Sequence, residues 1–171
     1  MKKIIFCLSI IVAFVSCKST KEINESKFVF EGCPDGGECE FEVIEDTRVF
    51  MAGDDQMGHF PKLESSKEMH TIKISYTKET MENLMDDEYI EVFYFTIGND
   101  QNKINLSNSE LYQANLIYGR ICACRGQTGY EKIDQGNLEV NFSGNSQHIK
   151  LQAKPNKYPI LMSELNIQKT N

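Results

Sequence analysis

The sequence predicts an all-β fold, either an antiparallel sandwich or an open barrel built from meander hairpins. Three observations carry this prediction. Apolar and polar residues alternate with a period of two in at least four separate segments. Turn-forming residues such as Gly, Asn and Asp lie between these segments. Helical periodicity is confined to residues 78–88, where Met81 and Met85 stand at positions i and i+4.

The first half of the predicted sheet structure begins at residues 38–46, which alternate strictly between apolar residues and acidic ones. Residues 48–51 form a short strand candidate. Residues 70–76 place their isoleucines and a tyrosine on one face. Residues 88–97 are apolar on both faces, which predicts a central strand with packing on each side.

The second half contains the strongest hairpin signal. Residues 137–142 and 148–153 alternate, and the SGNS sequence between them offers Gly and Asn for positive φ. Residues 111–124 are predicted as one long strand whose phase changes at Gly119, which indicates a bulge there. Residues 159–167 complete the set of predicted strands.

Length and charge limit the function classes. The chain has 171 residues, which suggests one domain and a short leader. Hydrophobic residues make up 40% of it, enough to form a core. The net charge of −7 disfavours nucleic-acid binding, which requires clustered Lys and Arg.

The N-terminus has the pattern of a secretory signal peptide. Two lysines precede an almost wholly apolar run at residues 4–15, which is shorter than the roughly 20 residues of a membrane span. We therefore predict a cleaved signal helix at residues 1–16, a flexible polar tether at residues 17–27 and a single β domain at residues 28–171. Loss of the two lysines takes the formal charge from −7 to −9.

The apolar run ends in Phe14-Val15-Ser16-Cys17, which resembles the lipobox of bacterial lipoproteins. This resemblance implies cleavage before Cys17, a diacyl lipid on its thiol and acylation of its new amino group. Two or more acyl chains give stable membrane anchoring. Lys18 in place of Asp implies, by the sorting habit of that family, the outer membrane of a Gram-negative bacterium. The remainder of the chain resembles only uncharacterised small envelope lipoproteins.

Four cysteines remain for the exported domain: Cys33, Cys39, Cys122 and Cys124. An oxidising compartment predicts two disulfides among them. A bridge between Cys122 and Cys124 along an extended strand would bring the Cα separation close to the upper limit of about 7 Å. We therefore expect each of these two to pair with Cys33 or Cys39. Each such bridge would contribute about 4 kcal/mol to the free energy of unfolding. Closure of the CPDGGEC segment on itself is the alternative.

A metal site is the competing interpretation of the same thiols. Four thiolates, with Met57 and His59 as further ligands, would suit Zn or Cu(I). The spacing C-x5-C with C-x-C matches no familiar zinc site, and an oxidising compartment opposes free thiols. The sequence also lacks the H-E-x-x-H, G-x-S-x-G and P-loop motifs. We therefore predict no catalytic residue, no cofactor and no metal.

One loop is a candidate binding site. Arg125, Gln127 and Tyr130 follow the paired cysteines, and loops on rigid β scaffolds often carry function. A simple turn is the alternative. We expect a lipid-anchored envelope protein with a non-catalytic binding or structural domain, attached to the membrane through Cys17 and recognising an envelope protein or a glycan. A metal-handling protein or an unrecognised envelope enzyme is the second hypothesis.

Overall fold

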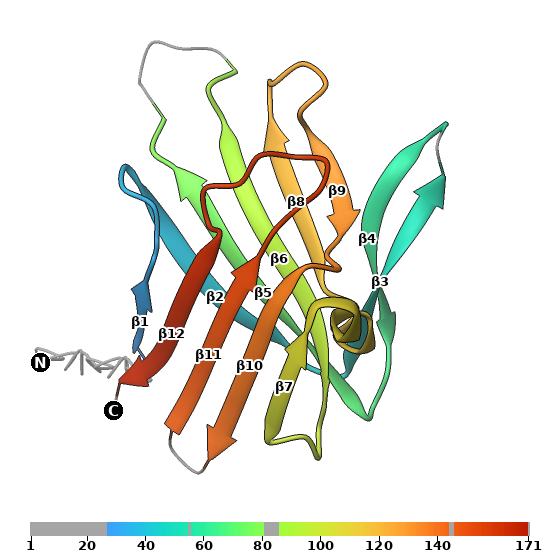
Figure 1. Ribbon diagram of the computed structural model, residues 1–171, viewed down its shortest axis with the longest axis vertical. Helices are drawn as coiled ribbons and strands as arrows, with labels where there is room; N and C mark the ends of the chain where they lie inside the picture. Colours follow the sequence, from blue (N-terminus) through green and yellow to red (C-terminus); the bar gives the residue numbers. More distant parts are fainter. Residues whose placement is uncertain (1–26, 55, 81–85, 144–145, 171) are drawn as a thin grey trace, which may run out of the picture.

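The computed structural model describes residues 27–54, 56–80, 86–143 and 146–170, and within them the fold is all-β, as predicted (Figure 1). Two five-stranded antiparallel sheets are accompanied by a two-stranded hairpin. The strands are β1 (Lys27–Glu31), β2 (Gly37–Ile44), β3 (Thr47–Asp54), β4 (Gly58–Ser65), β5 (Met69–Lys78), β6 (Tyr89–Gly98), β7 (Lys103–Ser107), β8 (Ile117–Cys122), β9 (Gly129–Lys132), β10 (Gly136–Ser143), β11 (Ser146–Ala153) and β12 (Glu164–Thr170).

The two sheets are joined by repeated crossovers of the chain. Sheet I has the strand order β1-β12-β11-β10-β7, and sheet II has the order β2-β5-β6-β8-β9. The chain passes from one sheet to the other after β1, β6, β7 and β9. The neighbours in each sheet are therefore often distant in sequence, and the arrangement is an open sandwich (Figure 1).

The core lies between the inner faces of the two sheets. Sheet II contributes aromatic side chains, and the rings of Phe93 and Tyr118 have centroids 5.2 Å apart. Sheet I contributes mainly aliphatic ones, with Phe28, Phe30 and Phe142 packed against them. The Tyr118 hydroxyl donates to the Pro159 carbonyl at 2.9 Å, so the polar group is satisfied. The residues at the centre of the core are Ile72, Ile74, Tyr76, Phe93, Phe95, Tyr118, Leu138, Val140, Ile149, Leu151, Leu165 and Ile167.

The β3–β4 hairpin packs on the outer face of sheet II. Val49 of β3 is fully buried, and its N–H donates to the Thr96 hydroxyl at 3.0 Å. Strand β3 contacts β5 and β6, and β4 contacts β9. This second layer explains why β6 is apolar on both faces, as its sequence predicted.

The sequence located several strands correctly. Residues 38–46 correspond to β2, residues 70–76 lie in β5, and residues 88–97 correspond to the central strand β6. The predicted hairpin is formed by β10 and β11, with Ser143 opposite Ser146.

Two of the predicted strands were wrong in part. Residues 111–116 are not extended, because a 3-10 helix, η1 (Asn108–Ala114), precedes β8. Its N-terminus is capped by Ser107, whose N–H and hydroxyl both donate to Glu110 at 3.1 Å. No bulge occurs at Gly119, since strand pairing continues on both sides of it. Residues 159–163 form a loop, and β12 begins at Glu164.

Some predictions fall outside the described residues. These are the signal peptide, the lipidated Cys17 and its tether up to residue 26, and the central part of the predicted helical segment, residues 81–85. In the described part of the chain, no helix has the length and apolar character needed to cross a membrane.

The ends of the described chain lie together. Lys27 of β1 stands opposite Thr170 of β12, at one end of the sandwich. The β1–β2 connection, the β8–β9 turn and the β11–β12 loop lie at the other end, drawn uppermost in Figure 1. We call this second end the distal end.

Candidate functional site

The predicted binding loop is a tight turn at the distal end. The Gln127 N–H donates to the Cys124 carbonyl at 2.9 Å, which closes a four-residue turn with Arg125 and Gly126 at its centre. Gly126 has a φ of +72°, a conformation that glycine adopts without strain. Arg125 is exposed at the tip, as the sequence predicted for a loop residue.

Gln127 and Tyr130 do not extend from the tip. Gln127 accepts a hydrogen bond from Arg120 Nη1 through its side-chain oxygen at 3.0 Å. Tyr130 belongs to β9 and lies opposite Gly119, where a Cβ would come within 2.3 Å of the tyrosine ring. Burial raises the pKa of the Tyr130 hydroxyl. The structure therefore does not bring the three predicted residues together into one binding surface.

Arg120 is the residue that sequence reasoning missed. Its guanidinium carbon lies 5.2 Å from the centroid of the Tyr89 ring, within the range of a cation–π contact. Its Nη2 lies 3.8 Å from the Cys124 sulfur. Its Nε is buried and has no hydrogen-bond partner within the described residues. The only signal in the sequence was its position in phase with Tyr118 and Cys122, on the inner face of β8.

Opposite Arg120 in the β6–β8 pairing lies Glu91, a buried carboxylate with no exposed surface. It accepts the backbone N–H of Leu161 at 2.8 Å and that of Met162 at 2.9 Å, and it also accepts the Tyr89 hydroxyl. Burial and this bond to Glu91 raise the pKa of Tyr89 to about 12. These bonds tie the centre of sheet II to the β11–β12 loop of sheet I.

The two disulfides are present, but their connectivity corrects our expectation. Cys33 bonds to Cys39, and Cys122 bonds to Cys124, with Cα separations of 6.0 and 5.1 Å. The prediction of cross-pairing assumed an extended chain through residues 122–124. Strand β8 ends at Cys122 and the chain bends at Ala123, which brings the two Cα atoms within bridging distance.

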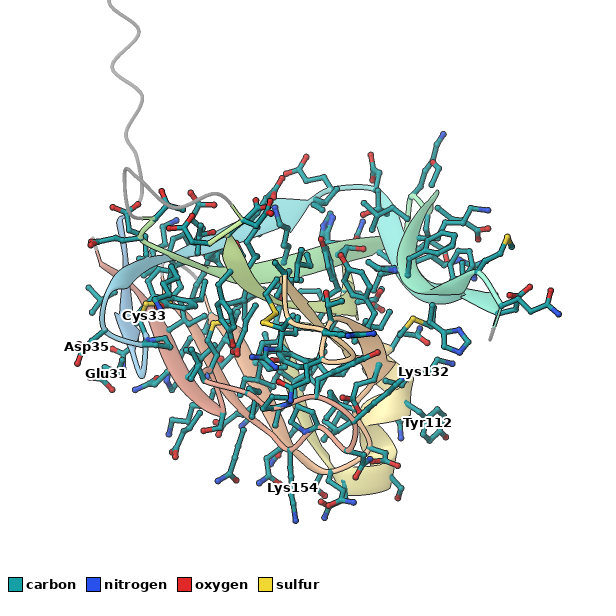
Figure 2. All side chains as sticks on the ribbon, turned by 90° about the horizontal axis from the view of Figure 1, so that it is seen from above. Glu31, Cys33, Asp35, Tyr112, Lys132 and Lys154 are labelled. Carbon is teal, nitrogen blue, oxygen red and sulfur yellow. A yellow bond between two sulfur atoms is a disulfide. The ribbon has the colours of Figure 1, made fainter. Side chains whose placement is uncertain are left out.

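The surroundings of the two bridges differ. Cys33 and Cys39 pack against the core, and the Tyr76 hydroxyl donates to the Asp35 carbonyl between them at 3.2 Å. Figure 2 looks onto the distal end and shows Cys33 with Glu31 and Asp35 at the edge formed by β1. The Cys33–Cys39 bridge therefore closes a crossover between the two sheets, whereas the Cys122–Cys124 bridge closes the turn of one hairpin.

The metal hypothesis gains no support from this geometry. All four of its cysteines are bonded in disulfides, so their thiolates are not available as ligands. Among the described residues no group of three or more His, Cys, Asp or Glu side chains is placed to hold a metal ion. Met57 is 78% exposed between β3 and β4, which pair only with each other, whereas Cys39 and Cys122 belong to strands of sheet II.

A second candidate site covers the outer face of sheet I. The residues that point away from the core form rows across the sheet, because each strand pairs in register with its neighbours. A groove of about 640 Å³ lies over this face. Its side chains come from all five strands of the sheet: Glu31, Asn105, Asn137, Glu139, Lys150, Gln152, Glu164 and Asn166.

The polar side chains of this face orient one another. Asn137 Nδ2 donates to Gln152 Oε1 at 3.0 Å. Asn166 Nδ2 donates to Glu31 at 2.6 Å, while its oxygen lies 2.5 Å from His148 Nε2. Six amide side chains share the face: Asn105, Asn137, Asn141, Gln152, Asn166 and Gln168.

The amide face has the chemistry of a hydrogen-bonding surface. Each primary amide offers two donor hydrogens and an acceptor oxygen. Glu139 faces Lys150 across the β10–β11 pair, and this pairing offsets part of the acidic charge. The alternation of residues 137–142 and 148–153 could have identified half of this surface, but its extension onto β7, β12 and β1 depends on strand order. This chain matches no protein-family model, no curated protein and no solved structure.

Proposed function

We propose that the chain is a lipid-anchored cell-envelope protein whose β domain is a non-catalytic binding domain for a glycan. The anchor rests on the lipobox-like sequence that ends at Cys17. The observation that carries the binding function is the outer face of sheet I, where six amide side chains and a groove of about 640 Å³ lie together. We call this surface the amide face.

The chemistry of the amide face favours a neutral, hydroxyl-rich ligand. Hydroxyl groups donate and accept hydrogen bonds, and primary amides do both as well. The groove side chains carry three carboxylates and one ammonium, which disfavours a polyanion such as nucleic acid. They include no aromatic side chain, whereas protein interfaces usually have an apolar, aromatic centre.

The position of the tether fits this role. Strand β1 is an edge strand of sheet I, and its Glu31 lines the groove. Nine residues lie between Cys17 and Lys27, and the ten residue-to-residue steps span at most about 35 Å when fully extended. A lipid on Cys17 would thus hold the amide face close to the membrane, within reach of the glycans of the envelope.

The test uses the full lipidated chain in detergent and a panel of neutral glucan, mannan and galactan oligosaccharides. We expect at least one to bind, and we expect Asn137→Ala combined with Gln152→Ala to abolish that binding. The matched control is Glu38→Ala with Thr77→Ala, a cross-strand pair on sheet II that should leave binding unchanged. Binding that survives the first pair of changes and is lost with the second would place the site elsewhere. Binding of none of the sugars would reject a glycan ligand.

The anchor has a separate test. Cys17→Ser should release the protein from membranes or leave it unprocessed, because serine cannot form the thioether to the lipid. Unchanged processing together with unchanged detergent partitioning would contradict lipidation. This outcome would leave the glycan test unaffected.

A further inference from the structure

The Cys122–Cys124 bridge lies where a partner can reach it. Both cysteines are partly exposed, and the residues that follow them, Arg125 to Thr128, are exposed at the distal end. The bridge spans a sequence separation of two residues within one hairpin. It therefore restrains only the local turn.

The turn has its own set of hydrogen bonds that do not involve the bridge. The Thr128 hydroxyl donates to the Arg120 carbonyl at 3.0 Å, and the Gln127 N–H donates to the Cys124 carbonyl at 2.9 Å. Arg120 Nη1 donates to Gln127 Oε1 at 3.0 Å. These bonds hold residues 120–128 in place, so two thiols formed by reduction would stay adjacent.

Arg120 is placed to stabilise one of those thiols as a thiolate. Its Nη2 lies 3.8 Å from the Cys124 sulfur, and the Tyr89 ring supports the guanidinium at 5.2 Å. The Nε, which has no partner within the described residues, keeps the capacity to donate to a new acceptor. A neighbouring arginine lowers the pKa of a cysteine thiol and makes its thiolate a better leaving group.

We propose that the Cys122–Cys124 disulfide is a redox-active site that exchanges two electrons with a dithiol protein. The proposal goes beyond glycan binding and does not rest on it. The Cys33–Cys39 bridge, which packs against the core beside Tyr76, is the structural disulfide of the same molecule.

The exchange proceeds in two balanced steps. A thiolate of the partner attacks the Cys122 sulfur, a mixed disulfide forms, and the Cys122–Cys124 bond breaks with Cys124 leaving as the thiolate beside Arg120. The second thiol of the partner loses its proton and attacks the partner's sulfur in the mixed disulfide. Cys122 leaves as a thiolate and takes up a proton. The partner is then a disulfide, and this chain carries the Cys122 thiol and the Cys124 thiolate.

The test is a redox titration of the full chain with dithiothreitol as the dithiol, followed by alkylation and quantification of each cysteine by peptide mass spectrometry. We expect Cys122 and Cys124 to be reduced at a less reducing potential than Cys33 and Cys39, while circular dichroism retains its β spectrum. Simultaneous reduction of both pairs with loss of the β spectrum, or earlier reduction of Cys33–Cys39, would overturn the proposal.

Variants of the arginine test its role. Arg120→Gln should lower the equilibrium constant for reduction of Cys122–Cys124 by about threefold or more, because the Cys124 thiolate loses its cation. Arg120→Lys should restore most of the effect, and Arg125→Gln, in the same turn, should cause no shift. A folded Arg120→Gln protein with an unchanged equilibrium constant would contradict the proposal. If that variant does not fold, the order in which the two disulfides of the unchanged chain are reduced tests the proposal by itself.

Discussion

The outer faces of the two sheets differ in what covers them. On sheet I the outward residues are polar apart from Val29 of β1, and several of them line an open groove. On sheet II the β3–β4 hairpin packs over one part, with Val49 bonded to Thr96, and the Tyr130 ring lies over Gly119 in another. Two sheets of equal strand number therefore differ in how much of their outer face is covered. Sheet II is packed over part of its outer face as well as on its inner face, whereas the outer face of sheet I lies open.

The largest loss of stability should follow from removal of the Glu91 carboxylate, which is buried and links the two sheets. Glu91→Ala removes the acceptor of the Leu161 and Met162 N–H groups, and buried donors without partners are costly. We expect the free energy of unfolding to fall by about 3 kcal/mol, measured by urea denaturation. Glu139→Ala, on the amide face, should change it by less than about 0.5 kcal/mol. Equal losses of stability in the two variants would contradict this difference between the sheets.

Weakening the contact between the β3–β4 hairpin and sheet II should cause the next largest loss of stability. Thr96→Val keeps the shape of the side chain but removes the hydroxyl that accepts the buried Val49 N–H. We expect a loss of about 1 to 2 kcal/mol in the free energy of unfolding. Thr77→Val, at an exposed threonine of β5 in the same sheet, is the matched control and should be nearly neutral. A neutral Thr96→Val would show that the hairpin packs only loosely.

The pH dependence of stability gives a third way to test sheet II. The pKa of Tyr89 is raised to about 12 in the folded protein, from an ordinary value of 10.0. The folded state therefore favours the protonated tyrosine, and its contribution is fully present below pH 10 and lost as the pH rises toward 12. We expect stability to fall over this range, and Tyr89→Phe to reduce the slope. A slope unchanged by this variant would assign the effect to other groups.

The smallest change in stability is expected from substitutions at the tip of the β8–β9 turn. Arg125→Ala should alter stability by less than about 0.5 kcal/mol, because its side chain is exposed. Gln127→Ala should cost somewhat more, about 0.5 to 1.5 kcal/mol, since it removes the acceptor for Arg120. Thermal denaturation distinguishes the two variants. A larger loss for Arg125→Ala would mean that the exposed arginine, and not Gln127, holds the turn.

The extent to which the sequence predicted this structure differs from one segment to another. In β10 and β11 one face is buried and the other is solvated, so alternation identified both the strands and their outward residues. Around η1 the apolar residues Leu111, Ala114 and Leu116 gave no clear period. The Ser107–Glu110 capping box was a usable signal that the strand prediction overlooked.

The candidate sites were harder to predict because they depend on contacts between distant segments. The amide face requires β7 beside β10 and β1 beside β12, and neither pairing follows from sequence order. Arg120 contacts Tyr89 and Cys124 only because strand pairing and the turn bring these two residues to it. The disulfide connectivity depended on where β8 ends, a boundary that the pattern of residues did not specify.

Glycan binding at the amide face is tested most directly by nuclear magnetic resonance. The experiment compares the backbone amide chemical shifts with and without an oligosaccharide that binds. If the amide face is the binding surface, the shifts should cluster at its outward residues, including Asn137, Gln152 and Asn166. The outward residues of sheet II and the β8–β9 turn should remain unchanged. Shifts confined to sheet II or to that turn, with the amide face unaffected, would contradict the account.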